Sequence, residues 1–380
     1  MTGRRIPSGV RFEHLYVHVP FCARRCVYCD FSIAVRPTVP VDEFVGALEA
    51  EWSVRHADHA FALRTLYFGG GTPSKLGGDG IARSMDVVRA HATIEPRAEV
   101  TLEANPEDVS ASAARSWLAA GINRVSLGVQ SFDDRVLKWM HRTHDTATAR
   151  RAIEVLRDAG AQNVSIDLIF AAPATLERDW PRDLDAALAY GLQHLSIYGL
   201  TVEPRTPLGR WVARSEVAEA AEDAFAEEFL QAHAALTDAG FEHYEVSNYG
   251  RPQSHSMHNW AYWMRTPYAG IGPAAHEFDG SHRRWNEAAY AGWVARVGSG
   301  SDPVEGRETL GAEQILGEDT YLRLRTSRGV QLRESEVQRA EPWVREGWAS
   351  VSGDLLTLTA AGWLRLDAIV SDLTLVRSRY

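Results

Sequence analysis

Between residues 15 and 200 the chain repeats one pattern of apolar and polar positions. A short apolar, β-branched run is followed by a loop with Gly, Pro, Asn or Asp and then by a stretch with helical spacing. The apolar runs that predict β-strands are 15–19, 65–68, 99–103, 124–129, 164–170 and 194–200. Helical stretches such as 41–57, 111–121 and 146–160 fit between them. This alternation predicts an α/β fold with a parallel sheet covered by helices. Because six units are fewer than the eight that close a TIM barrel, we expect an open, partial (β/α)6 barrel.

The pattern changes after residue 200. A long acidic, amphipathic helix is predicted over 216–240, followed by an irregular, aromatic-rich region and by a Gly/Ser-rich stretch at 298–303 that is typical of a linker. Helices at 313–325 and 334–346, a hairpin with a Gly-Asp turn and a last helix complete the chain, as in a small α+β, winged-helix-like domain. We therefore expect three parts: a barrel, a middle extension and a C-terminal domain. Their predicted bounds are 1–210, 211–301 and 302–380.

Charge argues against a nucleic-acid partner. The 40 Lys and Arg against 50 Asp and Glu give a net charge of -10, and residues 331–380 hold six Arg against seven acidic residues. The first residues lack the apolar stretch of a secretory signal, and no uncharged run reaches membrane-spanning length. We expect a cytoplasmic protein without a transmembrane segment, and peripheral membrane contact stays open. In that reducing compartment, cysteines indicate metal or thiol chemistry rather than disulfides.

All three cysteines lie in "FCARRCVYCDF", residues 21–31, directly after the first predicted strand. Buried structural cysteines are one alternative, but Arg24 and Arg25 make this loop polar. Zinc is another, although a zinc site with three thiolates normally takes a fourth ligand from the protein. The C-x3-C-x2-C spacing is compact enough to hold three corners of an iron–sulfur cubane, which leaves the fourth iron open for a small ligand.

With the aromatic Tyr28 before the third cysteine, this motif resembles the signature of the radical S-adenosylmethionine (SAM) superfamily. The resemblance implies a [4Fe-4S] cluster whose open iron binds SAM. The cluster ligands would be Cys22, Cys26 and Cys29.

Further motifs are similar to those of the oxygen-independent coproporphyrinogen III oxidase (dehydrogenase) family: "GGGTP" at 69–73, "LEANP", "GVQSF", "HRTH" and "IDLI". A triple glycine alone is also typical of a flexible turn. The resemblance implies SAM contacts at Tyr16, Gly70, Gly71, Thr72, Glu103, Gln130, Arg142 and Asp167. A carboxylate suits ribose hydroxyls, and an arginine suits a carboxylate. The family usually continues "IDLIYGLP", whereas this chain reads "IDLIFAAP", so Ala171 and Ala172 put the shape of that loop in doubt.

Two features distinguish branches of this family. The dehydrogenases carry a longer N-terminal extension and a further cysteine two positions after the third, where this chain has Phe31. The segment "HNWAYW" at 258–263 resembles the H-N-x-x-Y-W motif that the haem-chaperone branch associates with haem. Aromatic faces suit a flat porphyrin and imidazole is a common axial ligand, although an aromatic core segment is the alternative. The residues implied in haem binding are His258, Asn259, Tyr262 and Trp263.

The resemblance thus implies a haem chaperone that passes haem to apo-haem acceptor proteins and carries a [4Fe-4S] cluster and SAM. The alternative is a radical SAM enzyme that oxidises a porphyrinogen, or a radical methyltransferase. An electron donor such as flavodoxin or ferredoxin is a further partner left open. Whether the protein is an enzyme stays undecided from the sequence.

Overall fold

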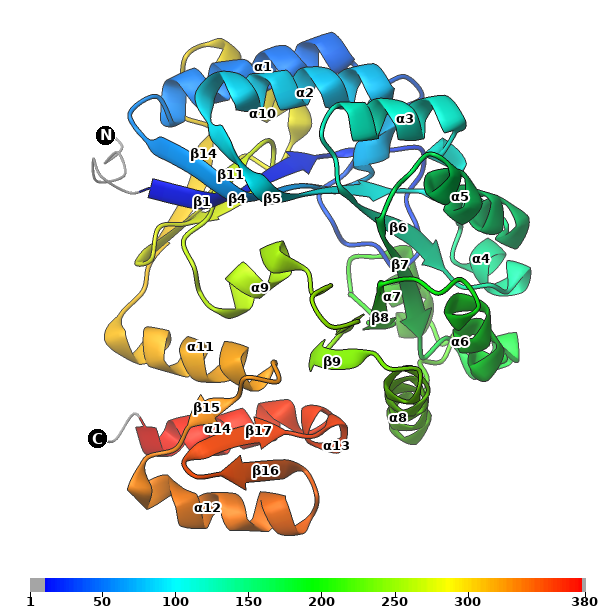
Figure 1. Ribbon diagram of the computed structural model, residues 1–380, viewed down its shortest axis with the longest axis vertical. Coiled ribbons are helices and arrows are strands. Elements are labelled where there is room, and N and C mark those ends of the chain that lie inside the picture. The colour runs from blue at the N-terminus through cyan, green and yellow to red at the C-terminus, as the bar shows by residue number, and fades with distance from the viewer. Residues whose placement is uncertain (1–10, 378–380) are drawn as a thin grey trace.

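The computed structural model describes residues 11–377, and the N-terminal stretch in which we looked for a signal segment, residues 1–10, lies outside them. The centre of the fold is a nine-stranded sheet (Figure 1). Six strands lie side by side in chain order and parallel: β1 (Arg11–Val19), β4 (Ala60–Gly70), β5 (Thr93–Ala104), β6 (Arg124–Gln130), β7 (Asn163–Phe170) and β8 (His194–Gly199). They confirm the predicted open (β/α)6 barrel.

Helices cover the outer side of this sheet (Figure 1). They are α1 (Val41–Arg55), α2 (Gly77–His91), α3 (Ala111–Ala119), α4 (Asp134–Trp139), α5 (Thr146–Asp158) and α6 (Trp180–Leu188), with short 3-10 turns at Pro73–Leu76, Pro106–Asp108 and Ala174–Leu176. Side chains alternate along each strand, so Leu15, Val17 and Val19 of β1 enter the apolar core. The intervening Tyr16 and His18 face the opposite, concave side of the sheet.

Two short additions extend the sheet beyond the six strands. β11 (Ala269–Ile271) pairs parallel to β1, while β10 (Asn248–Gly250) and β9 (Glu242–Glu245) add antiparallel strands next to β8. The predicted acidic helix is shorter than expected, since α8 spans Glu222–Asp238 and follows α7 (Pro207–Ala213). Helix α9 (Met257–Trp263) lies on the side of the sheet opposite α1 to α3 (Figure 1).

The predicted linker at 298–303 is a turn within one structural unit. It joins α10 (Tyr290–Gly298) to β14 (Val304–Thr309), and β14 pairs with β13 (His282–Asn286), which also pairs with β12 (His276–Phe278). Residues 304–309 therefore lie with the preceding extension, so interpreting 298–303 as a linker was wrong. The division into three domains itself stays a prediction.

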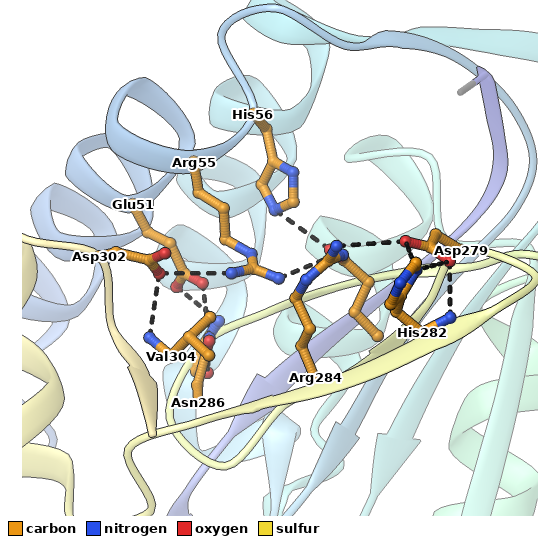
Figure 2. Close-up of polar contacts among 11 residues, drawn as sticks. Glu51, Arg55, His56, Asp279, His282, Arg284, Asn286, Asp302 and Val304 are labelled. Carbon is orange, nitrogen blue, oxygen red and sulfur yellow. Dashed lines mark hydrogen bonds and ion pairs between the residues drawn. The ribbon is translucent and has the colours of Figure 1, made fainter. Parts of the chain in front are cut away.

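A buried polar network connects helix α1 to the middle extension that contains β12, β13 and β14 (Figure 2). The carboxylate of Glu51 accepts hydrogen bonds from Gly272 N (2.8 Å), Trp293 Nε1 (2.8 Å) and Asn286 Nδ2 (2.6 Å). Its burial raises the pKa of Glu51 to about 7. Because Gly272 directly follows β11, these bonds fix the edge of the sheet beside β1.

A second part of the network consists of ion pairs. Arg55 of α1 and Arg284 of β13 both contact the buried carboxylate of Glu277, at 2.9 and 3.0 Å. Arg55 also reaches Asp302 at 3.3 Å (Figure 2). Because a buried carboxylate is costly unless it is paired, this arrangement satisfies Glu277 and ties the extension to the barrel.

The chain ends in a small α+β unit. A three-stranded sheet in the order β15-β17-β16 packs with helices, as in a winged helix. Its elements are α11 (Ala312–Leu324), β15 (Val330–Gln331), α12 (Glu334–Arg345), β16 (Ala349–Ser352), β17 (Leu355–Leu358), α13 (Ala360–Trp363) and α14 (Leu366–Arg377). Elsewhere, in the cysteine loop after β1, β2 (Phe21–Cys22) and β3 (Ala34–Val35) form a separate two-stranded pair. The predicted helices and hairpin are confirmed. Within residues 11–377 we find no helix long and apolar enough to cross a membrane.

Candidate functional site

A cavity of about 420 Å³ opens at the carboxyl ends of the parallel strands. Ten of the eleven residues predicted to hold a cluster or SAM line it: Cys22, Cys26, Cys29, Gly70, Gly71, Thr72, Glu103, Gln130, Arg142 and Asp167. Tyr16 does not line it. Its hydroxyl lies 3.3 Å from His18 Nδ1, and its ring packs on Tyr67 with centroids 6.1 Å apart. The topology of the sheet thus brings residues from five strands and the cysteine loop to one place.

The three thiols are unpaired and surround one end of this cavity. Cys22 Sγ lies 3.4 Å from Thr72 Oγ1, and Arg142 Nη1 donates to Cys26 Sγ at 3.5 Å. Burial raises the pKa of Cys22 to about 11 and also raises the pKa of Cys29. The side chains around the thiols supply a hydroxyl and a cation, which suit thiolates that bind iron.

The three thiols are not grouped as ligands of a single metal ion. Across residues 11–377, no three His, Cys, Asp or Glu side chains are grouped closely enough to hold a single metal ion. In a cubane each thiolate binds a different iron, so its ligands stand farther apart than those of a mononuclear site.

Glycine is required where the loop after β4 meets the cysteine loop. A Cβ at Gly71 would lie 2.6 Å from the carbonyl oxygen of Pro20 and 3.0 Å from Cys22 Sγ. Gly70 has a φ of 117°, and a Cβ there would meet the His18 ring at 2.8 Å. The glycines therefore let the second strand approach the thiols closely, which explains the triple glycine better than a flexible turn does.

Two carboxylates line the cavity from β5 and β7, the strands on either side of β6. Glu103 accepts hydrogen bonds from Tyr67 Oη (2.8 Å) and Gly70 N (3.1 Å), and Asp167 accepts one from Ser126 Oγ (3.1 Å). Burial raises the pKa of Glu103 to about 7 and raises the pKa of Asp167 as well. Both side chains are thus held in place as hydrogen-bond acceptors on the cavity lining, and a SAM-binding role for them remains a prediction.

Arg142 contacts both a thiol of the cysteine loop and residues at the carboxyl ends of β5 and β6. Its Nη2 donates to Asn105 Oδ1 (2.7 Å) and to Gly128 O (3.0 Å). Burial acts to lower the pKa of Arg142, but nearby Tyr28, Cys26 and Glu107 raise it above its usual range, so the guanidinium stays charged. Burial likewise acts to raise the pKa of Glu107, but hydrogen bonds from His144 and Thr143 hold it at about 2.

Tyr67, Asn105 and Glu107 also belong to this site, although no motif in the sequence signalled them. Tyr67 lies two residues before Gly69 on β4, so the alternation of the strand faces would have indicated its side. Asn105 and Glu107 stand in the "LEANPE" segment, where the motif signalled only Glu103. Their roles depend on contacts with Arg142 and residues 143–144, far away in the sequence.

The "HNWAYW" segment forms α9 and lies outside this cavity. His258 is 1% exposed, and its Nδ1 lies 2.6 Å from Thr65 Oγ1 while its Nε2 lies 2.9 Å from Tyr262 Oη. Burial lowers the pKa of His258 to about 3, so the imidazole is neutral. Since both ring nitrogens have hydrogen-bonding partners, His258 has to leave one of them before it can bind iron.

The other motif residues share this packed position. The guanidinium of Arg325 lies over the Trp263 ring at 5.0 Å, and Asn259 N donates to Ser256 Oγ at 3.4 Å. The structure thus brings His258 and Tyr262 into contact but places neither beside the thiols. A haem-binding role for the four residues remains a prediction.

The loop with the unusual "FAAP" sequence contains one residue in the left-handed backbone conformation. Ala171 has a φ of 59°, the left-handed conformation that favours glycine, and its N–H donates to Glu228 Oε2 at 2.6 Å. The alanine therefore adopts a conformation in which glycine would be less strained.

Comparisons with known proteins agree with this geometry. The Radical SAM superfamily pattern matches residues 16–187. The heme chaperone HemW of Mycobacterium tuberculosis is 39% identical over 374 residues, which cover 97% of this chain and 95% of the relative. HemW of Bacillus subtilis is 31% identical (83% and 84% covered), and HemW of Escherichia coli is 38% identical (69% of each chain). The solved coproporphyrinogen III oxidase HemN of Escherichia coli superposes with a TM-score of 0.81 at 21% identity, covering 98% of this chain and 91% of HemN, and so shares the fold.

Proposed function

This chain belongs to the HemW family of the radical SAM superfamily, and from this premise we propose that it is a haem chaperone, which binds haem and transfers it to apo-haem proteins. The observation that carries the proposal is the near-complete alignment, at 39% identity, with proteins named heme chaperone HemW. The superfamily implies a [4Fe-4S] cluster and SAM. The cytoplasm is its proposed location.

The residues around the cavity fit these two groups. Cys22, Cys26 and Cys29 would hold the cluster, and the Arg142 guanidinium beside Cys26 would offset its negative charge. Glu103 and Asp167 would accept the nucleoside hydroxyls. A bound cluster supplies the electron that reductive SAM cleavage needs, and an acidic flavodoxin or ferredoxin is our proposed donor.

For haem we propose the α9 segment, with His258 as the iron ligand. Its imidazole is neutral, as a metal ligand must be, and is surrounded by Tyr67, Tyr262 and Tyr16, whose rings suit a porphyrin face. Haem binding there requires α9 to move, because His258 is buried and both its nitrogens are hydrogen-bonded.

Porphyrinogen oxidation is the less favoured alternative. The likeness to HemN, at 21% identity, extends to the fold alone. Phe31, which is 62% exposed, stands where the dehydrogenases carry their further cysteine. Several bacterial relatives above 30% identity over most of the chain are named as haem chaperones.

Hemin titration tests the proposal. We expect the anaerobically reconstituted protein to bind hemin and to pass it to apomyoglobin, and we expect His258→Ala to weaken hemin affinity at least tenfold. His255→Ala is the matched control, because His255 precedes α9 and pairs with Glu242 at 2.7 Å. Equal hemin spectra and affinities for wild type and His258→Ala would overturn the ligand assignment. Robust formation of protoporphyrinogen from coproporphyrinogen III would overturn the chaperone function.

A further inference from the structure

One side chain connects α9 with the cavity. The Tyr67 ring stacks on the imidazole of His258, with centroids 5.0 Å apart and planes 28° apart. The hydroxyl at the other end of Tyr67 donates to Glu103 Oε1 at 2.8 Å. Tyr67 therefore touches both the proposed haem ligand and a carboxylate proposed to bind SAM.

The orientation of Glu103 depends on this tyrosine. Its Oε1 accepts from Tyr67, and its Oε2 accepts from the backbone N–H of Gly70 at 3.1 Å. Without the hydroxyl, only the glycine N–H would hold the carboxylate, and one buried oxygen would lose its donor. An acceptor that is no longer preorganised binds a nucleoside hydroxyl less well.

The position of Tyr67 depends in turn on His258. Hydroxyl groups on both sides fix the imidazole, since Thr65 Oγ1 contacts Nδ1 and Tyr262 Oη contacts Nε2. Thr65 is itself held by His14 Nδ1 at 2.8 Å. Iron needs the lone pair of one ring nitrogen, so ligation takes the imidazole away from one of these hydroxyls and withdraws the surface on which Tyr67 stacks.

We propose that Tyr67 is a positioning residue that couples α9 to Glu103, so that haem ligation by His258 and SAM binding at Glu103 oppose each other. The inference rests on the proposed function, in which His258 ligates haem. Linkage makes the opposition reciprocal: a protein loaded with SAM binds haem more weakly, and a protein loaded with haem binds SAM more weakly.

The first test measures SAM affinity without haem, by equilibrium dialysis on anaerobically reconstituted protein. Tyr67→Phe keeps the ring and removes the hydroxyl, and His258→Ala removes the stacking surface. We expect at least tenfold and fivefold weaker SAM binding, respectively. Tyr249→Phe is the control, because the buried Tyr249 hydroxyl has no hydrogen-bonding partner among residues 11–377. Unchanged SAM affinity in both Tyr67→Phe and His258→Ala overturns the coupling.

The second test measures hemin affinity with and without saturating SAM, a difference that a loss of stability alone does not produce. We expect saturating SAM to weaken hemin binding at least fivefold in wild type and by less than twofold in Tyr67→Phe. If hemin binding requires His258 but is indifferent to SAM in wild type, the coupling is wrong and the chaperone function stands. If His258→Ala binds hemin like wild type, the ligand assignment fails, and the coupling between haem ligation and SAM fails with it.

Discussion

Ala171 illustrates strain held in a single residue. Its φ of 59° costs about 1–2 kcal/mol relative to an ordinary backbone conformation, and this strain would vanish in glycine. Replacing it by glycine also removes a buried methyl group, about 0.8 kcal/mol, and adds chain entropy to the unfolded state. We expect these effects nearly to cancel, so that Ala171→Gly changes the free energy of unfolding by less than about 0.5 kcal/mol. Ala172→Gly, without strain to relieve, should lose about 1–2 kcal/mol in the same urea titration. Equal losses would contradict the strain.

Glu51 is the residue for which the structure predicts a pH dependence. Its folded pKa of about 7 lies above the unfolded value of 4.5, so the folded state holds more protons between these values. Stability from this group is therefore fully present below pH 4.5 and is lost as the pH rises to about 7. We expect wild type to lose about 3 kcal/mol relative to Glu51→Gln across this range. The exposed Glu154→Gln is the control, and a constant difference between wild type and Glu51→Gln would contradict the prediction.

Single residues were predictable where the chemistry is local in sequence. The three cysteines lie within eight consecutive positions and follow one strand, so their shared position needed no long-range contact. The burial of His258 could not be predicted, because it depends on Thr65 and Tyr67, which are almost two hundred residues earlier. For Tyr67 the strand period indicates the side that it faces, but not its contacts with both Glu103 and His258.

At the level of elements, α9 is held by a carboxylate of the central sheet. The buried side chain of Glu99 on β5 accepts hydrogen bonds from the backbone N–H groups of Met257 (3.1 Å) and His258 (2.9 Å) at the first turn of the helix. A helix of seven residues has little stability of its own and depends on such contacts.

We therefore expect Glu99→Ala to loosen α9 specifically. It leaves two N–H groups without their acceptor, which costs about 1–3 kcal/mol for α9. Amide hydrogen exchange of residues 257–264 should become faster, while exchange of β6 and β7 stays unchanged. Glu95→Ala on the same strand is the control. If the protection of α9 does not change, Glu99 does not hold the helix.

Elements were predictable where the apolar period is long and regular. The six parallel strands and the helices between them follow from alternation and from apolar runs. The structure lengthens five of the strands and shortens the sixth, β8, by one residue, and it ends α1, α3 and α5 two residues earlier than expected. The strands β9, β10 and β11 have three or four residues each, which is too few to show a period. They extend the sheet by pairing, β11 with β1, β10 with β8 and β9 with β10. The linker prediction failed for the same reason, since pairing of β14 with β13 is not visible in "GSGSDP".

The large apolar core extends from the barrel into the C-terminal unit. Barrel residues such as Leu66 and C-terminal residues such as Leu356 and Trp363 belong to the same buried cluster. Backbone hydrogen bonds reinforce this joint, because Val246 N donates to Arg325 O and Ser327 N donates to Tyr244 O, both at 2.9 Å. A shared core predicts that the barrel and the C-terminal unit unfold together.

Arg377 allows this cooperativity to be tested from the end of the chain. It is 6% exposed, its Nε and Nη2 each donate to Glu336 at 3.0 Å, and its Nη1 donates to Thr320 Oγ1 at 3.0 Å. Arg377→Met leaves the buried Glu336 carboxylate without a cation, which costs about 3–5 kcal/mol.

If the molecule unfolds as one, Arg377→Met lowers a single transition, and urea curves followed by far-UV circular dichroism and by tryptophan fluorescence coincide. The matched control is Arg339→Met, whose exposed ion pair with Asp372 should leave the midpoint essentially unchanged, because water and salt screen such pairs. Two separate transitions in Arg377→Met, with the later one at the wild-type midpoint, would instead show that the C-terminal unit unfolds alone. The shared core makes the single transition the expected result, because exposing Leu356 and Trp363 also uncovers the apolar surface of the barrel against which the unit packs.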